Sequence, residues 1–348
     1  MTENHEFFMD RCFQLAQQGE GLVAPNPKVG AVLVHQNQII AEGYHQKFGE
    51  AHAEVNCINS CPETYIEFIA ESTLYVSLEP CSHYGKTGPC SHLIVDKGIQ
   101  KVVVGSRDFN PIVNGNGIAY LKENGVEVIE LNWGDKQKNL NPQFYINQVY
   151  KRPYIIAKYA QSADGFMSKN DETIKITPAT VDVLSHKIRS QVDAVLIGKN
   201  TFRIDKPLLN VRLVEGKNPD RIVLDSNLEN DYSCWASDSQ KTIVLNQKQE
   251  QNFQSLYYTK INDFNDIVEI INVLFSKGYY SILIEGGSQT LQSFLDNNVV
   301  DHLILYTNHN LKIKEGVGSP KWDESKFNLI KKQIVESIEI NIFKSCNI

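Results

Sequence analysis

The chain has 348 residues, more than one average domain holds, so two domains are expected. Its formal net charge of −7 argues against a general binder of nucleic acid, because such a protein needs a basic surface to neutralise phosphates. The N-terminus lacks the basic and apolar regions of a secretory signal, and no apolar run is long enough for a membrane span. We therefore expect a cytoplasmic protein, in which clustered cysteines indicate metal binding or catalysis more often than disulfides.

The first part of the chain predicts alternating helices and strands. Apolar residues recur at three- and four-residue spacing over 5–19, which indicates a helix, and a hairpin is expected over 29–43. The next expected elements are a helix that opens at His52, a strand over 73–78, a helix over 90–98, a strand over 101–105, a helix over 118–123 and a strand over 126–129. Together they predict an α/β domain.

A more polar passage over 132–151 ends at Arg152-Pro153, and the domain boundary is placed there. The expected domains are residues 1–147 and 152–348. Strands of the second domain are expected over 154–158, 194–198, 221–225, 242–245, 281–285 and 303–306, and helices over 178–189, 267–277 and 290–295. This alternation predicts a mostly parallel sheet.

One imidazole and two thiols suggest a metal site: His52, Cys81 and Cys90. Three nitrogen and sulfur ligands leave one of the four tetrahedral positions of zinc open for water, which is the catalytic arrangement. Glu54 lies two residues after His52, where it can take a proton from the water and pass it to a leaving nitrogen. This pattern is typical of the zinc base deaminases, whose signature is His-x-Glu followed by Pro-Cys and a second Cys.

Two other interpretations of these residues stay open. The cysteines can be small buried residues and the histidine a helix cap, although three such residues in this pattern make that reading the weaker one. A purely structural zinc site would need a fourth protein ligand, for which Cys57 and Cys61 are candidates in principle.

In the second domain, Gly286-Gly287 follows an expected strand and precedes an expected helix. Backbone N–H groups at such a helix N-terminus suit an anion, although a simple turn is the alternative. Arg189, Arg203 and Arg212 are candidates to neutralise a substrate phosphate, or else solvated surface charges.

Several motifs resemble the RibD family of bifunctional riboflavin biosynthesis enzymes. They are Asn26-Pro27-x-Val29-Gly30, Gly43-Tyr44-His45, His52-Ala53-Glu54-Val55, the run from Leu78 to Cys90, and Asp108-Phe109-Asn110-Pro111. The family also has the long loop that separates the two cysteines here. The resemblance implies an α/β protein, with an N-terminal cytidine-deaminase-like α/β/α domain and a C-terminal dihydrofolate-reductase-like α/β domain.

The resemblance also implies two reactions. The first is zinc-dependent hydrolytic deamination of 2,5-diamino-6-ribosylamino-4(3H)-pyrimidinone 5′-phosphate, and the second is NADPH reduction of its ribosyl group to ribityl. It implies one Zn²⁺ ion per chain held by His52, Cys81 and Cys90, with Glu54 as the catalytic proton shuttle and Asn26 as a substrate contact. The expected partner is a small phosphorylated pyrimidine rather than nucleic acid or membrane, and a homo-oligomer is expected.

In the second domain the resemblance is carried by Lys158-x-x-x-Ser162-x-Asp164-Gly165 and by Glu285-Gly286-Gly287. The residues it implies for the NADPH site are Ala160, Lys175, Thr201, Asp205, Ser226 and Gly287. Those it implies for the substrate are Thr173, Arg189, Leu209, Arg212 and Glu285. The sequence departs from the family at Phe166, where an arginine is common, and at Lys175, where a tryptophan is common. The alternative is therefore a deaminase whose reductase-like domain only binds ligand.

Overall fold

The computed structural model describes residues 4–84, 88–170 and 174–347. The chain divides into two compact units, Met1–Lys151 and Arg152–Ile348, called here the first and second units. Within the described residues, no helix is long and apolar enough to cross a membrane.

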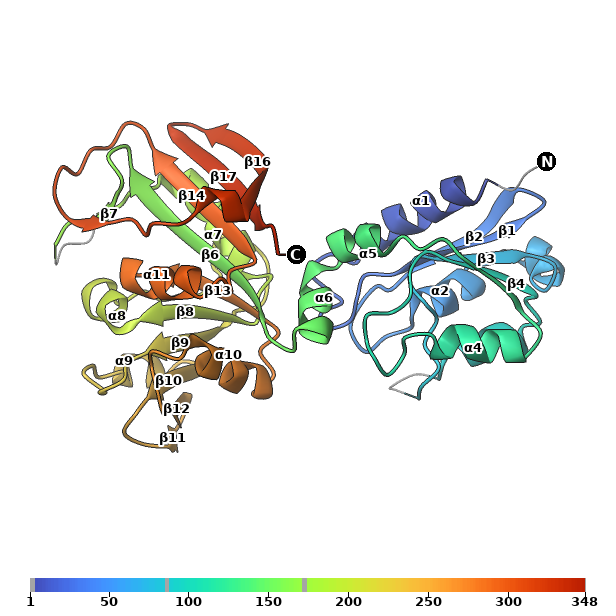
Figure 1. Cartoon of the computed structure of the whole chain (residues 1–348), viewed down its shortest axis with the longest axis horizontal. Helices are drawn as coiled ribbons and strands as arrows, with labels where there is room; N and C mark the ends of the chain where they lie inside the picture. Colours follow the sequence, from blue (N-terminus) through green and yellow to red (C-terminus); the bar gives the residue numbers. More distant parts are fainter. Residues whose placement is uncertain (1–3, 85–87, 171–173, 348) are drawn as a thin grey trace. The chain divides into compact units, whose positions relative to one another are not determined.

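The first unit is built on a five-stranded sheet (Figure 1). In sheet order its strands are β2 (Gln38–Tyr44), β1 (Gly30–His35), β3 (Thr73–Val76), β4 (Lys101–Val104) and β5 (Glu127–Glu130). Strand β1 is antiparallel to both of its neighbours, whereas β3, β4 and β5 are parallel. The carboxyl ends of β3 and β4 therefore lie at one edge, where loops that carry functional groups commonly meet.

Helices cover both faces of this sheet and give an α/β/α arrangement. The helical elements are α1 (His5–Gln17), α2 (Ala53–Asn59), the 3₁₀ helix η1 (Glu63–Phe68), α3 (Cys90–Asp96), α4 (Asn116–Glu123), α5 (Gly134–Leu140) and α6 (Pro142–Val149). Leu33 and Leu74 belong to the buried cluster that includes residues of α2, α3 and α4. Val32 and Tyr75, whose side chains alternate with these, belong to the cluster that includes α1.

The passage over 132–151 differs from the polar connection that its composition suggests, because it forms α5 and α6. Pro142 begins α6, a position where its missing N–H costs nothing. The Asn141 side chain accepts a hydrogen bond from the Lys28 N–H at 2.7 Å and donates one to the Lys28 carbonyl at 2.9 Å. Such short helices bury too few apolar residues to produce a clear period in the sequence.

The second unit contains a ten-stranded sheet. In sheet order its strands are β11 (Gln251–Phe253), β12 (Leu256–Lys260), β10 (Thr242–Asn246), β9 (Asp220–Leu224), β8 (Ala194–Gly198), β13 (Ser281–Gly286), β6 (Tyr154–Ser162), β14 (His302–Asn308), β17 (Ile338–Ser345) and β16 (Phe327–Val335). The strands from β12 to β14 are parallel, as the sequence predicts, and β11, β17 and β16 are antiparallel additions at the edges. A small separate sheet pairs β7 (Phe166–Ser168) with β15 (Val317–Gly318).

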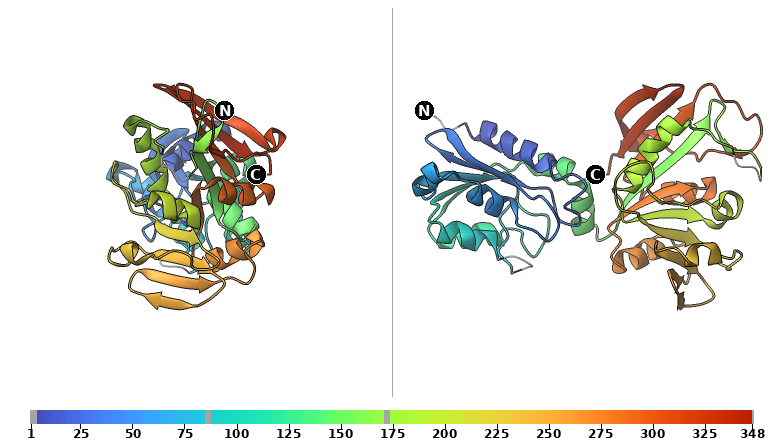
Figure 2. Two further views of the ribbon diagram at one scale, coloured as in Figure 1. Left: turned by 90° about the vertical axis from the view of Figure 1, so that its left-hand side faces the viewer. Right: turned by 180° about the vertical axis from the view of Figure 1, so that it is seen from behind.

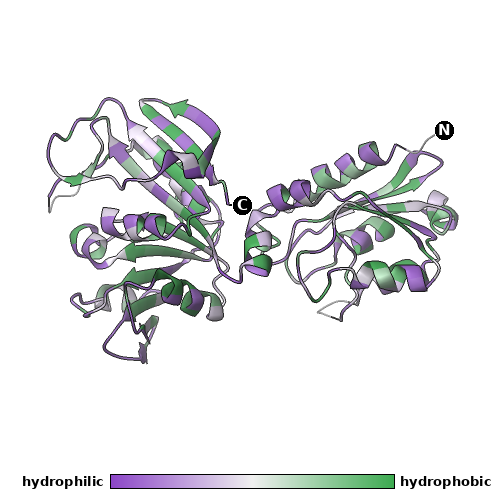
Figure 3. Ribbon diagram, viewed as in Figure 1, coloured by the Kyte–Doolittle hydropathy of each residue, from purple (hydrophilic) through white to green (hydrophobic). Residues whose placement is uncertain are grey.

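Helices lie on both faces of the large sheet as well: α7 (Ala179–Arg189), α8 (Lys199–Asp205), α9 (Ser233–Ala236), α10 (Ile267–Ser276) and α11 (Ser288–Asp296), with the 3₁₀ helix η2 (Glu324–Lys326) near the end of the chain. Helices α10 and α11 pack on the face turned to the viewer in Figure 1, and α7 is seen in the rear view of Figure 2. The central strands are mainly hydrophobic along their whole length (Figure 3), as expected for parallel strands buried on both faces.

Candidate functional site

Three metal-binding side chains come together in the first unit. The Nδ1 atom of His52 lies 3.5 Å from the Sγ of Cys81 and 3.4 Å from the Sγ of Cys90, and all three atoms lie within 4.8 Å of one another. His52 immediately precedes α2, Cys81 follows the end of β3, and Cys90 is the first residue of α3. Three elements that are distant in sequence thus present one nitrogen and two sulfurs to a single point.

Two glycines allow these elements to approach so closely. A Cβ atom on Gly43 of β2 would lie 2.2 Å from the backbone nitrogen of Cys57 in α2. A Cβ atom on Gly117 of α4 would lie 1.9 Å from the carbonyl oxygen of Pro80. Side chains at these positions would therefore push α2 away from the sheet and α4 away from the residue that precedes Cys81.

The carboxylate of Glu79 organises the loop beside the metal-binding group. It is buried and accepts hydrogen bonds from four backbone N–H groups at 2.9 to 3.2 Å, those of Asp108, Gly115, Gly117 and Ile118. Glu79 lies within the motif that runs from Leu78 to Cys90, but the sequence did not predict this role. An acidic residue directly after a buried strand was the available signal, because a buried carboxylate needs donors around it.

Glu54 lies in the first turn of α2 and is only 3% exposed. Burial, together with the nearby Cys81, raises the pKa of its carboxyl to about 7, so it can both accept and release a proton near neutrality. The hydrogen bonds from the Cys90 thiol and from His52 lower the pKa of Cys81 to about 4 despite its burial. A thiolate at this position suits a metal cation.

Asn26 is linked to the metal-binding group through the side chain of His45. Its Nδ2 atom is 3.2 Å from the Nε2 atom of His45, whose Nδ1 is 3.0 Å from the carbonyl oxygen of Ala51. The ring of His45 packs edge-on against that of His52, with 5.3 Å between the ring centroids. The structure therefore brings Asn26 and the three predicted ligands into one neighbourhood.

The second unit holds a cavity of about 910 Å³. Its walls come from β6, the segment before α7, α8, the end of β9 and the junction of β13 with α11. All six residues predicted for the cofactor line it: Ala160, Lys175, Thr201, Asp205, Ser226 and Gly287. The volume is at the upper end of the range for small-molecule and cofactor sites.

Among the predicted substrate residues, Glu285 lines this cavity, and Arg189 binds Glu285. The guanidinium donates to both carboxylate oxygens of Glu285, from Nη2 at 2.5 Å and from Nε at 3.1 Å. Burial alone would raise the pKa of Glu285, but Arg189 and Lys158 outweigh it, so the pKa is lowered and the side chain stays ionised.

Leu209 and Arg212 are not among the described residues that line the cavity. Leu209 is buried and adopts a positive φ of 51°, and the backbone N–H of Arg212 donates to the Nδ1 atom of His186 at 3.2 Å. Thr173 lies outside the described residues.

Two lysines on the cavity wall have contacts that the sequence did not predict. The ammonium group of Lys158 lies 4.9 Å from the centre of the Tyr306 ring, and burial lowers the pKa of the lysine. Lys175 pairs with Asp182 at 3.1 Å, and both residues line the cavity. This part of the wall is therefore charged.

Two protein families match the two units. The cytidine and deoxycytidylate deaminase zinc-binding region matches residues 2–106, and the RibD C-terminal domain matches residues 153–308. The fold and these matches define the class: a cytidine-deaminase-like α/β/α unit followed by a reductase unit of the dihydrofolate reductase type.

Relatives and a solved structure match this chain across both units. Riboflavin biosynthesis protein RibD of Actinobacillus pleuropneumoniae is 37% identical over 86% of this chain and 82% of its own, and that of Aquifex aeolicus is 35% identical over 86% and 85%. The crystal structure of a diaminohydroxyphosphoribosylaminopyrimidine deaminase/5-amino-6-(5-phosphoribosylamino)uracil reductase from Thermotoga maritima is 34% identical, with a TM-score of 0.84 over 98% of this chain and 99% of that chain. The chain therefore belongs to the RibD family, and it is an enzyme with a deaminase domain and a reductase domain.

Proposed function

We propose that the first unit removes an amino group from 2,5-diamino-6-ribosylamino-4(3H)-pyrimidinone 5′-phosphate, and that the second unit then reduces the ribosyl group of the product with NADPH. The observation that carries the proposal is the convergence of His52, Cys81 and Cys90 beside the buried Glu54. The proposed substrate is the one that the name of the similar Thermotoga maritima enzyme gives for its deaminase and reductase activities.

The donor set supports one zinc ion per chain. One imidazole nitrogen and two sulfurs are preferred zinc ligands, and among the described residues no fourth His, Cys, Asp or Glu joins the group. A zinc ion held there would lower the pKa of its water, so that hydroxide would be available as the nucleophile at neutral pH. Glu54 would accept the proton that the water loses and donate it to the departing amino nitrogen, so that ammonia leaves. Its raised pKa supports both directions of transfer.

The wall of the cavity supports the assignment of the reductase cofactor and substrate. Bound NADPH supplies a hydride. Ala160, Thr201, Ser226 and Gly287 are small enough to let a dinucleotide approach the backbone, and the lysines on the wall supply positive charge for its phosphates: Lys158, Lys175 and Lys199. Glu285, held by Arg189, presents an anionic acceptor for the ribosyl hydroxyls at one side of the same cavity.

Product mapping with purified protein tests the proposal. With substrate alone, we expect about one ammonia released per substrate and no ribityl product, because deamination needs no reductant. Added NADPH is then oxidised only once deaminated intermediate is present. NADPH oxidation that precedes or replaces ammonia release would overturn the proposed order.

The interpretation of the second unit as a mere ligand-binding domain is not favoured, because both domain families match and the relatives match over both units. Deaminated intermediate supplied directly, with NADPH, distinguishes the two. Turnover supports a working reductase, whereas binding without turnover supports the simpler role.

A further inference from the structure

Residues 206–219 of the second unit carry the predicted substrate residues Leu209 and Arg212. All of them are described, and they form neither helix nor strand. They connect the end of α8 to the start of β9, and this stretch is called the connecting segment. Because this segment has no secondary structure, its backbone groups need partners other than the regular hydrogen bonds of a helix or sheet.

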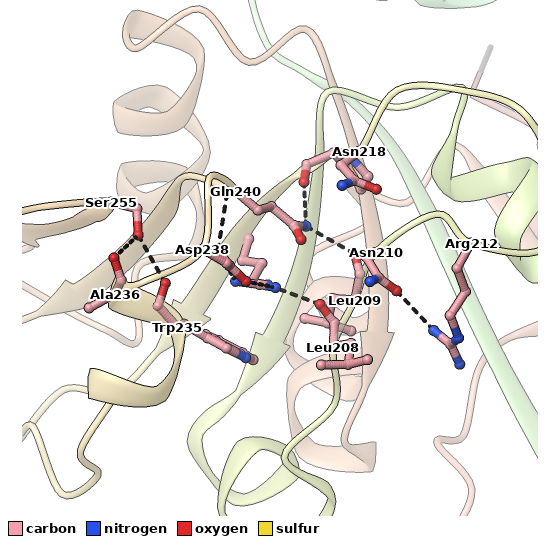
Figure 4. A network of polar contacts seen from close by, with 12 residues as sticks. Leu208, Leu209, Asn210, Arg212, Asn218, Trp235, Ala236, Asp238, Gln240 and Ser255 are labelled. Atoms are coloured by element: carbon pink, nitrogen blue, oxygen red, sulfur yellow. Dashed lines mark hydrogen bonds and ion pairs between the residues drawn. The ribbon is translucent and has the colours of Figure 1, made fainter.

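Side chains supply these partners, and each of the five consecutive residues 208–212 has a backbone group bound by one of them. The carbonyl of Leu208 accepts from the Nε of Arg221 at 3.0 Å, and that of Leu209 accepts from the Nε2 of Gln240 at 3.1 Å (Figure 4). The carbonyl of Asn210 accepts from the Nη1 of Arg189 at 3.3 Å. The next two N–H groups, of Val211 and Arg212, donate to the Oδ1 of Asn218 and the Nδ1 of His186 at 2.7 and 3.2 Å.

Gln240 also holds the far end of the segment. The same Nε2 atom donates to the carbonyl of Pro219 at 2.6 Å, so one buried amide joins two backbone positions ten residues apart. Leu209 has a positive φ of 51°, which costs energy for a leucine and persists only where neighbours enforce it. The Gln240 amide and the packing of Leu209 beside Trp235 supply that enforcement.

Arg221 makes the anchor rigid. Its side chain is 1% exposed, it donates to both carboxylate oxygens of Asp238 at 3.1 and 2.7 Å, and its guanidinium lies 4.6 Å from the centre of the Trp235 ring. Asp238 in turn accepts from the backbone N–H of Gln240 at 3.0 Å, which fixes the residue that carries the amide. The three side chains form one connected unit, called the Arg221 anchor: Arg221, Asp238 and Gln240.

Arg189 connects the anchored segment to the reductase cavity by hydrogen bonds. Arg189 binds the carbonyl of Asn210 with one nitrogen and the carboxylate of Glu285, on the cavity wall, with two others. A shift of the connecting segment would therefore move the Arg189 guanidinium and alter its hydrogen bonds to the Glu285 carboxylate. By contrast, the hydrogen bonds that the anchor makes to the segment begin at Leu208, beyond the predicted cofactor residue Asp205.

We propose that the Arg221 anchor positions the connecting segment for binding of the deaminated intermediate, and that it governs the KM for this substrate but not the KM for NADPH. Arg221, Asp238 and Gln240 are positioning residues, since they act through Leu208, Leu209 and Asn210 rather than by touching the substrate. This inference rests on the proposed function of the second unit. Without the anchor, the segment populates other conformations, and apparent affinity falls by the fraction that remains competent.

The test compares two substitutions that each remove side-chain hydrogen bonds to two carbonyls. Gln240→Met keeps the length of the side chain and removes the donors to Leu209 and Pro219. Ser255→Ala is the matched control, because the Ser255 hydroxyl lies 2.9 Å from the carbonyl oxygens of both Trp235 and Ala236 in the same region and bonds nothing in the connecting segment (Figure 4). Arg221→Lys is a second test variant that keeps the charge but loses the planar fork.

For Gln240→Met we expect a rise of about tenfold in the KM for the deaminated intermediate, because buried carbonyls that lose their donors drive the segment to other conformations. The KM for NADPH and the rate of ammonia release stay at wild-type values, and Arg221→Lys changes the same KM in the same direction. Ser255→Ala lowers resistance to urea but leaves the substrate KM unchanged. That last result separates positioning from a general loss of stability.

Three results would overturn the inference. They are an unchanged substrate KM in folded Gln240→Met, an equal rise in the KM for NADPH, and an equal rise in substrate KM in Ser255→Ala. If the wild-type chain itself oxidises no NADPH with the intermediate, the proposed function fails and the inference fails with it. If the wild-type chain is active and the variants give one of these three results, the inference is wrong but the proposed function stands.

Discussion

At the scale of single residues, the first unit uses two buried carboxyl groups in different ways. Glu54 is buried beside the Cys81 thiolate, and both features raise the pKa of its carboxyl to about 7. Glu79 is buried nearby but has four backbone donors around its carboxylate. Two neighbouring carboxyl groups are thus used differently: Glu79 holds structure, and Glu54 is available for proton transfer.

Replacement of Glu54 by glutamine should remove that proton transfer while preserving size. We expect the kcat for ammonia release to fall by about 10² to 10⁴, the usual contribution of a positioned acid or base. Zinc content and NADPH oxidation with supplied intermediate should stay at wild-type levels. Ammonia release at the wild-type rate would show that another group carries the proton.

At the scale of elements, the contact between α4 and the Pro80 carbonyl sets a strict limit on side-chain size. Gly117→Ala places a methyl group where only 1.9 Å is available, so α4 must move and Glu79 loses donors. We expect lower zinc content, weaker ammonia release and a loss of about 2 to 4 kcal/mol in the free energy of unfolding of the first unit. Urea denaturation and metal analysis measure these effects.

Gly134→Ala is the matched control in the same unit. Its added Cβ would meet nothing nearer than the Ser106 hydroxyl at 3.9 Å, and the residue begins α5, where alanine is favourable. Its stability should equal or slightly exceed that of wild type. If both glycine variants lose zinc to the same degree, close packing at Pro80 is not the cause.

The pairing of β14 with β17 predicts a pH dependence in the second unit. His302 stands opposite Lys344 in this pair, and burial, with a smaller contribution from Lys344, lowers its pKa from 6.5 to about 4. Between these two values the unfolded chain binds a proton on this ring and the folded chain does not. Stability from this group is therefore complete above pH 6.5 and is lost as the pH falls toward 4, by on the order of 1 to 3 kcal/mol.

Urea denaturation of the second unit at pH 7 and pH 5 measures this effect, and His302→Gln should make the difference smaller. Lys344→Gln is a useful companion variant, since it removes the nearby positive charge and keeps the imidazole. It should reduce the pH dependence only in part, because burial is the larger cause. A slope that His302→Gln leaves unaltered would assign the acid sensitivity to other groups.

Elements also decide how much the sequence could predict. The metal-binding group was predictable because its residues have a fixed chemistry and a recognisable spacing, and the buried parallel strands were predictable from continuous apolar runs. The hairpin of β16 and β17 was not predicted, because the exposed pair Leu329-Ile330 is followed by two lysines, which breaks the alternation of a half-buried strand.

The Arg221 anchor was beyond sequence reasoning for a different reason. Arg221 lies at the start of an expected apolar strand, where the sequence suggests a solvated charge, yet it is almost completely buried, with Trp235 and Asp238 against it. Its partners lie in segments with no period at all. A pattern of apolar residues gives no information about which side chain satisfies the backbone of an irregular segment.

At the scale of the whole molecule, each unit has its own sheet and its own buried clusters. Removal of zinc by a chelator should therefore abolish ammonia release while NADPH oxidation with supplied intermediate continues. It should also lower the unfolding temperature of the first unit, since a ligand that binds only the folded state stabilises it. Restored ammonia release on addition of zinc is the control, and a parallel loss of both activities would contradict the independence of the units.

All three metal-binding side chains occur within the first 90 residues, and their unit is complete at Lys151. Domains made first on the ribosome commonly fold before the rest of the chain is synthesised. The nascent polypeptide can thus acquire its ion while the reductase half is still being translated, and truncation downstream of the boundary would leave a protein fragment that still titrates with zinc.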